Sequence, residues 1–209
     1  MEQTSLAPEL ALERLAAGNR RFRGAVGTAG AVAWTPGLAT GPQRPFAVIL
    51  GCSDSRIPVE IVFDVGFGDL FVVRVAGNIV APSLVGSIEF AVSQFGSRLV
   101  VVLGHADCGA VAATVHALET GLGPESKNIR AITDRIAPHI EALVRSGARG
   151  EVGHEAVRAN VRASADHLRH GSPLLEELVA AGTVAVVGAE YVLETGTVDF
   201  FDGAQELGR

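Results

Sequence analysis

Short uninterrupted apolar runs alternate with helix-like segments from Phe46 onward, and this alternation most constrains the fold. The runs FAVILG, LFVVRVAG and RLVVVLG are separated by PVEIVFD and SLVGSIEFAVSQFG. β-branched runs of this length between helical stretches are typical of parallel strands that crossover helices cover on both faces. A later run, TVAVVGAEYVLET, and the segment TVDFF predict a last strand with a hairpin-like extension. We therefore expect an α/β fold whose central sheet has about four parallel strands plus a C-terminal edge strand, flanked by helices.

The N-terminal region has a different character from the rest of the chain. Residues from about Pro8 to Phe22 carry apolar side chains at helical spacing and predict an amphipathic helix. Residues 24–45 are rich in Gly, Pro, Ala and Thr without periodicity, so they predict an irregular arm. A largely helical stretch is expected over 127–180, with one interruption near 146–150. We expect one domain over residues 1–209 with an N-terminal helical arm, since 209 residues suit a single core.

Composition excludes several classes of partner. The chain has 17 basic and 23 acidic residues and a formal net charge of -6, so it offers no electrostatic footprint for nucleic acid. No stretch approaches the roughly 18 to 20 uncharged apolar residues that a membrane span needs. The first residues also lack a basic region followed by an apolar core. We expect a cytoplasmic protein that binds neither nucleic acid nor membrane.

The chain contains two cysteines, and each follows a predicted buried strand. The run FAVILG leads into Cys52, with Asp54 and Arg56 on the same loop, and the run RLVVVLG leads into His105 and Cys108. Open parallel sheets bind ligands at the carboxyl ends of their strands, where these loops begin. In a reducing compartment such a cysteine pair favours metal binding or catalysis over a disulfide. The two loops converge if their strands are neighbours in the sheet.

Cys52, His105 and Cys108 supply two thiolates and one imidazole, a donor set that suits one Zn²⁺ in tetrahedral geometry. Three protein ligands leave one coordination position open, which is typical of a catalytic rather than a structural zinc site. Zinc lowers the pKa of a bound water to about 7, so the expected nucleophile is zinc-bound hydroxide.

Asp54 has two possible roles beside this donor set. Its carboxylate either binds the metal as a fourth ligand and closes the site, or accepts a hydrogen bond from the bound hydroxide. Arg56 carries a planar fork that matches a carboxylate bidentately, and an Asp54–Arg56 pair would hold the carboxylate away from the metal. The sequence leaves both states open.

Two of these motifs together resemble the β-class carbonic anhydrases. They are C-S-D-S-R at 52–56 and G-H-A-D-C-G at 104–109, and the likeness extends to G-N-R-R-F at 18–22, Q-R-P at 43–45, F-V-V-R-V-A-G-N at 71–78 and G-S-I-E-F-A at 86–91. The resemblance implies reversible hydration of CO₂ to bicarbonate and a proton, with zinc held by Cys52, His105 and Cys108. It also implies that Asp54 and Arg56 form the catalytic dyad.

The same resemblance implies roles for residues outside the two loops. Gln43 matches a glutamine that hydrogen-bonds substrate, often from the neighbouring subunit, and Phe71 is similar to part of the apolar wall beside the metal. The family's usual unit is a homodimer, often doubled to a tetramer, so residues 1–44 are expected to pack on a partner subunit. Two alternatives stay open: hydrolysis of COS or CS₂ at the same zinc, and a catalytically silent zinc-binding module closed by Asp54.

Overall fold

A mixed five-stranded sheet forms the centre of the computed structural model, which describes residues 5–24, 40–146 and 152–207. The strands are β1 (Ala47–Gly51), β2 (Leu70–Arg74), β3 (Leu99–His105), β4 (Ala185–Val192) and β5 (Thr197–Asp202). Their order is β2-β1-β3-β4-β5; the first four pair in parallel, and β5 runs antiparallel to β4. The predicted sheet, with its C-terminal edge strand, is confirmed.

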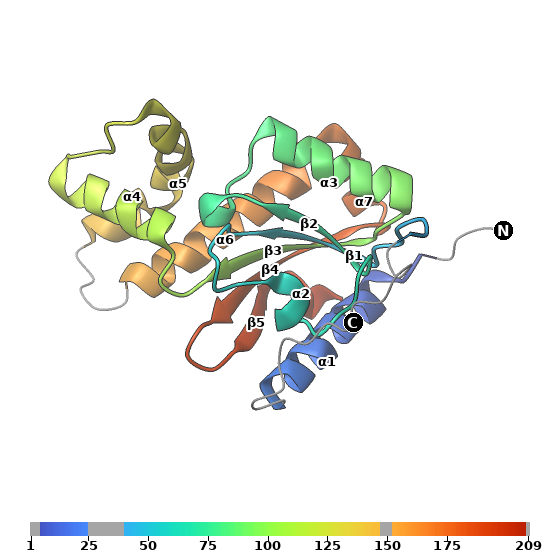
Figure 1. Ribbon diagram of the computed structural model, residues 1–209. Helices are drawn as coiled ribbons and strands as arrows, with labels where there is room; N and C mark the ends of the chain where they lie inside the picture. Colours follow the sequence, from blue (N-terminus) through green and yellow to red (C-terminus); the bar gives the residue numbers. More distant parts are fainter. Residues whose placement is uncertain (1–4, 25–39, 147–151, 208–209) are drawn as a thin grey trace.

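Helices cover both faces of this sheet. They are α1 (Pro8–Gly24), α2 (Val59–Val62), α3 (Pro82–Phe95), α4 (Gly109–Thr120), α5 (Lys127–Arg145), α6 (Val152–His170) and α7 (Pro173–Ala180), with 3₁₀ turns η1 (Ala76–Asn78) and η2 (Ala204–Glu206). Figure 1 shows α3, α6 and α7 on one face, α1 and α2 on the other, and α4 and α5 beyond the carboxyl ends of the parallel strands. None of the described helices is long and apolar enough to cross a membrane.

The core explains why the apolar runs form strands. Every residue of β1 and β3 is buried, because helices cover the two strands from both sides. Apolar side chains of α1 and α2 pack on one face of the sheet, and those of α3, α6 and α7 pack on the other. A third cluster joins α4, α5 and α6 and includes Cys52 and Cys108. The two cysteines therefore lie on a packed apolar support at the strand ends.

The long C-terminal helical stretch has one more break than expected. Between α6 and α7 the Ser172 hydroxyl accepts a hydrogen bond from the Leu175 amide, and Pro173 occupies the first turn of the new helix. A serine N-cap followed by proline is a strong start signal, so the chain begins a new helix here. Of the interruption expected near 146–150, residues 147–151 lie outside the described part of the chain.

The N-terminal helix packs on its own chain. Ala11 and Leu15 are fully buried against the sheet, while Leu10 on another side of α1 is exposed. The Asn19 side chain donates to the carbonyl oxygens of Val62 and Gly196 at 3.1 and 2.9 Å. One face of α1 is thus occupied within the chain, and packing of residues 1–44 on a partner stays a prediction. Most of the expected arm, residues 25–39, lies outside the described residues.

Gly18 marks the closest approach of α1 to the rest of the molecule. A Cβ at this position would lie 1.8 Å from the carbonyl oxygen of Phe63, whereas a Cβ at Gly24 would meet nothing within 4 Å. We expect Gly18→Ala to lower the free energy of unfolding by about 3 kcal/mol in urea titrations, because the helix must shift from the core. Gly24→Ala is the matched control and should unfold at or above the wild-type urea midpoint. Equal midpoints for the two variants would contradict this packing.

Candidate metal centre

The metal centre is built at the carboxyl ends of two neighbouring strands. β1 and β3 pair in parallel, with Gly51 opposite Leu103. Cys52 follows β1 directly, His105 ends β3, and Cys108 is the N-cap residue of α4. Parallel neighbours end at the same edge of a sheet, so the pairing brings together two loops that are far apart in the sequence. This convergence is the one that the sequence predicted.

The three side chains form a compact and buried donor set. Their ligand atoms all lie within 4.8 Å of one another. Cys52, His105 and Cys108 are 6%, 0% and 3% exposed, and both cysteines are free thiols. Asp107 takes a left-handed conformation, with φ of 55°, in the turn between His105 and Cys108. That turn lets two residues only three positions apart aim at one point.

The imidazole of His105 is arranged as a metal ligand. Its Nδ1 lies 2.7 Å from the carbonyl oxygen of Ala106, so Nδ1 carries the proton and donates. Nε2 is buried and has no hydrogen-bond partner among the described residues. A buried, unpartnered nitrogen beside two thiols is what a metal ligand requires, since burial without a partner is otherwise costly. The donor set therefore fits Zn²⁺.

The pKa values of the two thiols shift in opposite directions. A hydrogen bond from Cys108 lowers the pKa of Cys52, and the same contact together with burial raises the pKa of Cys108. The backbone amide of Gly77 also donates to Cys52 Sγ, at 3.4 Å. One sulfur is thus ready as a thiolate, which is the form that binds metal.

Asp54 lies beside the donor set and is held by Arg56. Asp54 Oδ1 accepts hydrogen bonds from the backbone amide and Nε of Arg56 at 2.9 and 3.0 Å, and Oδ2 accepts from Nη2 at 2.8 Å. The Arg56 guanidinium holds the pKa of Asp54 well below its usual range. Asp54 Oδ2 is also 3.9 Å from His105 Nε2. The carboxylate therefore lies beside the ligand set while it is paired with arginine.

Arg74 fixes the shape of the loop that carries Asp54. From the end of β2 its Nε donates to the Cys52 carbonyl at 2.9 Å, and its Nη2 donates to the Asp54 carbonyl at 2.7 Å. The Arg56 side chain also reaches the Asp107 carbonyl at 3.4 Å, which links the two loops. No sequence pattern predicted a role at the metal centre for Arg74 or for the Gly77 amide. The only available signal was the F-V-V-R-V-A-G-N run that contains both.

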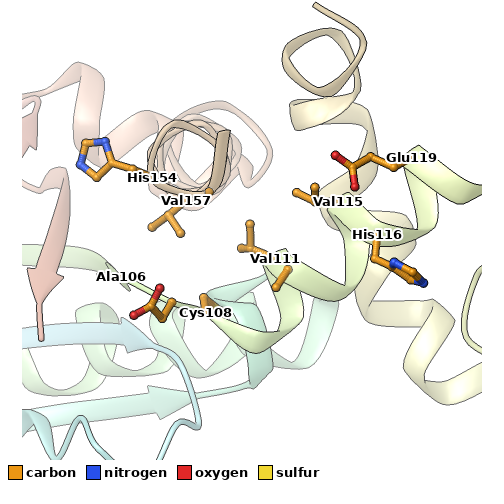
Figure 2. Close-up of a pocket in the computed structure, with 11 residues that line it drawn as sticks. Ala106, Cys108, Val111, Val115, His116, Glu119, His154 and Val157 are labelled. Atoms are coloured by element: carbon orange, nitrogen blue, oxygen red, sulfur yellow. The ribbon is translucent and has the colours of Figure 1, made fainter. Parts of the chain in front are cut away.

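A cavity of about 470 Å³ lies between α4 and α6 and reaches Cys108. Figure 2 shows Val157 of α6 and Val111 of α4 on its walls, with Cys108 near its base. His154 also lines it, and through Nε2 this histidine contacts the buried carboxylate of Glu190 at 3.0 Å. The two valines make part of the wall next to Cys108 apolar.

The structure does not bring Gln43 or Phe71 to the metal ligands of the same chain. Gln43 precedes β1 and lines a separate cavity of about 400 Å³, whereas Cys52 follows the other end of that strand. Phe71 pairs with Val48, four residues before Cys52, which is about 13 Å along the strand. The Phe71 ring packs on the Phe95 ring, and the two ring centroids are 5.9 Å apart. Roles for Gln43 and Phe71 at a metal site therefore require the site of another subunit, and they stay predictions.

Comparison with known proteins identifies close relatives. A family model described as carbonic anhydrase matches residues 47–198. The carbonic anhydrase of Mycolicibacterium smegmatis is 41% identical over 169 residues, 81% of each chain, and carbonic anhydrase 2 of Mycobacterium tuberculosis is 40% identical over 172 residues, 82% of this chain and 81% of the relative. Among solved structures, a tetrameric β-carbonic anhydrase from Sordaria macrospora aligns with a TM-score of 0.69 and 25% identity, covering 92% of this chain and 97% of that one.

Proposed function

Because the chain belongs to the β-class carbonic anhydrase family, we propose that it catalyses the reversible hydration of CO₂ to bicarbonate and a proton. One observation carries the proposal: Cys52, His105 and Cys108 converge at the strand ends, with the Asp54 carboxylate facing them. Two sulfurs and one imidazole leave a coordination position for chemistry, and a carboxylate beside it orients the nucleophile.

We infer that Cys52, His105 and Cys108 hold one Zn²⁺ per chain. When bound there, zinc would act as a Lewis acid that lowers the pKa of a bound water to about 7 and so makes a nucleophile available near neutral pH. Asp54 Oδ2 accepts a hydrogen bond from the attacking oxygen. This bond orients a lone pair of the attacking oxygen toward the carbon of CO₂. Arg56 keeps Asp54 ionised and in place through its hydrogen bonds.

CO₂ suits the surroundings of the site because it is small and uncharged. The cavity beside Cys108 is lined in part by Val111 and Val157, which offer apolar contact to a small uncharged molecule. COS and CS₂ share this property, but the relatives that match the chain are named carbonic anhydrases. The comparisons therefore favour CO₂ over these substrates and over a silent zinc module.

The activity is tested directly on zinc-loaded protein. Stopped-flow measurement with a pH indicator should give kcat/KM for CO₂ hydration of at least about 10⁴ M⁻¹s⁻¹. Sulfide release from COS, measured on the same sample, should be much slower. Faster turnover of COS than of CO₂ would favour the hydrolase alternative. One zinc per chain with no activity at any pH would favour the silent module.

We also propose that the working unit is a homodimer or a dimer of dimers. β2 is an edge strand in the described sheet. Its residue Phe71 packs on Phe95 of α3, and the Phe95 ring lies 5.5 Å, centroid to centroid, from the exposed Phe90 ring. An apolar strand edge of this kind is a suitable surface for a second copy. A partner is also needed if Gln43 is to approach Cys52. The tetrameric Sordaria macrospora relative supports oligomer formation.

Mixed dimers test whether Gln43 acts on the partner's metal site. Gln43→Ala should lower CO₂ hydration because the substrate oxygen loses a hydrogen-bond donor, and Cys108→Ala should abolish it. When the two variants are co-expressed, each mixed dimer has one intact metal site that faces a wild-type Gln43. Activity should then recover to about a quarter of the wild-type value per chain, since half of the dimers are mixed and each has one complete site. No recovery above the Gln43→Ala contribution would contradict action across the interface.

A further inference from the structure

The sulfur of Cys52 contacts an unusual backbone turn. The amide of Gly77, in η1, donates to Cys52 Sγ at 3.4 Å. Gly77 has φ of 71° and Asn78 has φ of 42°, both in the left-handed region. A Cβ at Gly77 would lie 2.9 Å from Ile136 Cδ1 and 3.0 Å from the Ala110 side chain. Only glycine fits at this position, and its backbone amide N–H lies against Cys52 Sγ.

The other side of the same glycine is held from a distant helix. Asn160 lies in the middle of α6, 83 residues further along the chain, and its Nδ2 donates to the Gly77 carbonyl at 2.8 Å. The Asn160 side chain is 2% exposed, so this bond is shielded from water. A buried amide placed on one carbonyl fixes the orientation of that residue, because breaking the bond would leave both groups unpaired.

We propose that Asn160 is a positioning residue for the metal centre. It holds Gly77 so that the Gly77 amide stays against Cys52 Sγ, and thereby sets the orientation and electron density of that ligand. The inference rests on the proposed metal site. Groups that orient ligands through hydrogen bonds typically change metal affinity by about 10- to 100-fold when they are removed. A purely structural Asn160 would affect only the stability of the fold.

The test compares Asn160→Leu, which has a similar volume but no donor, with Ser164→Ala. Ser164 is a matched control because it is also a buried polar residue of α6, one turn further along and 6% exposed. Zinc release to excess chelator should be about 10- to 100-fold faster in Asn160→Leu and unchanged in Ser164→Ala. With Co²⁺ in place of zinc, the sulfur-to-cobalt charge-transfer band should shift only in Asn160→Leu. Folding of each variant is checked by circular dichroism and Tm.

A folded Asn160→Leu with wild-type zinc release and an unshifted cobalt band would overturn the proposal. If this variant does not fold, the wild-type protein loaded with cadmium-113 decides by NMR. The Gly77 amide proton should couple to the metal through Cys52 Sγ, and the Asn160 side-chain amide protons should exchange slowly. Absence of either signal would overturn the proposal. These readouts are independent of turnover, so wild-type protein that binds metal but does not hydrate CO₂ refutes the proposed function alone.

Discussion

Asp54→Asn is expected to lower kcat for CO₂ hydration by about 10²- to 10³-fold, while zinc content stays close to one per chain. In the wild-type protein both carboxylate oxygens are used. Oδ1 and Oδ2 accept from Arg56, and Oδ2 also lies 3.9 Å from His105 Nε2. An asparagine has one acceptor oxygen in place of two, so its amide nitrogen must face either the arginine or the attacking oxygen. If the nitrogen faces the attacking oxygen, the nucleophile loses its hydrogen-bond acceptor. If it faces Arg56, two donors meet and the side chain loses the contacts that hold it in place.

Asp64→Asn is the matched control for this variant. Asp64 also pairs with an arginine, with Oδ2 at 2.6 Å from Arg21 Nε, but it lies on the loop after α2 and is not one of the residues that form the metal centre. Removing this exposed ion pair should leave kcat unchanged and cost little stability. Stopped-flow hydration rates and metal analysis on both variants are the measurements.

The Asp54→Asn result also separates the two states of the site that the sequence left open. Wild-type turnover with full zinc content would show that Asp54 has no catalytic role. A fall in zinc content together with turnover would identify Asp54 as a metal ligand, because a carboxamide is a poorer ligand than a carboxylate. Loss of turnover alone is the outcome that the Asp54–Arg56 geometry predicts.

The convergence of Cys52, His105 and Cys108 could be predicted from the sequence for a simple physical reason. Buried parallel strands are recognisable as continuous apolar runs, and their carboxyl ends lie at one edge of the sheet. Cys52 and His105 each stand at the end of such a run, so their convergence needed only the assumption that β1 and β3 are neighbours. The strand runs also gave the fold, because periodicity and length are local properties of the chain.

The groups that support the ligands could not be predicted in this way. Arg74, Gly77 and Asn160 act through contacts between elements that are far apart in the sequence, and three of these contacts use backbone carbonyls that leave no signal in the residue types. The positions of Gln43 and Phe71 relative to the metal centre could not be predicted either, for a different reason. Resemblance implied a role for them at a metal centre, but only the structure shows that Gln43 and Cys52 lie at opposite ends of β1 and that Phe71 lies beside Val48, near the start of that strand.

Cys108→Ala is expected to remove both the metal and the stability that the metal supplies. The remaining Cys52 and His105 offer two donors, too few for tight binding of Zn²⁺, so zinc content should fall below about a tenth per chain and hydration should be lost. Wild-type protein at a zinc concentration about 1,000 times its Kd gains about 4 kcal/mol of unfolding free energy from binding. Tm should therefore rise with added zinc in the wild type and fail to rise in the variant.

Val111→Ala separates loss of the metal from loss of packing. Val111 is buried on the same helix, α4, and belongs to the same apolar cluster as Cys108. Its truncation should lower the free energy of unfolding by about 1 to 3 kcal/mol through lost apolar contact. Zinc content and the rise of Tm with added zinc should nevertheless stay at wild-type values. A zinc-dependent Tm in Cys108→Ala would mean that the thiol of Cys108 does not bind the metal. Loss of zinc dependence in Val111→Ala would mean that packing in this cluster, not the thiol, accounts for the effect.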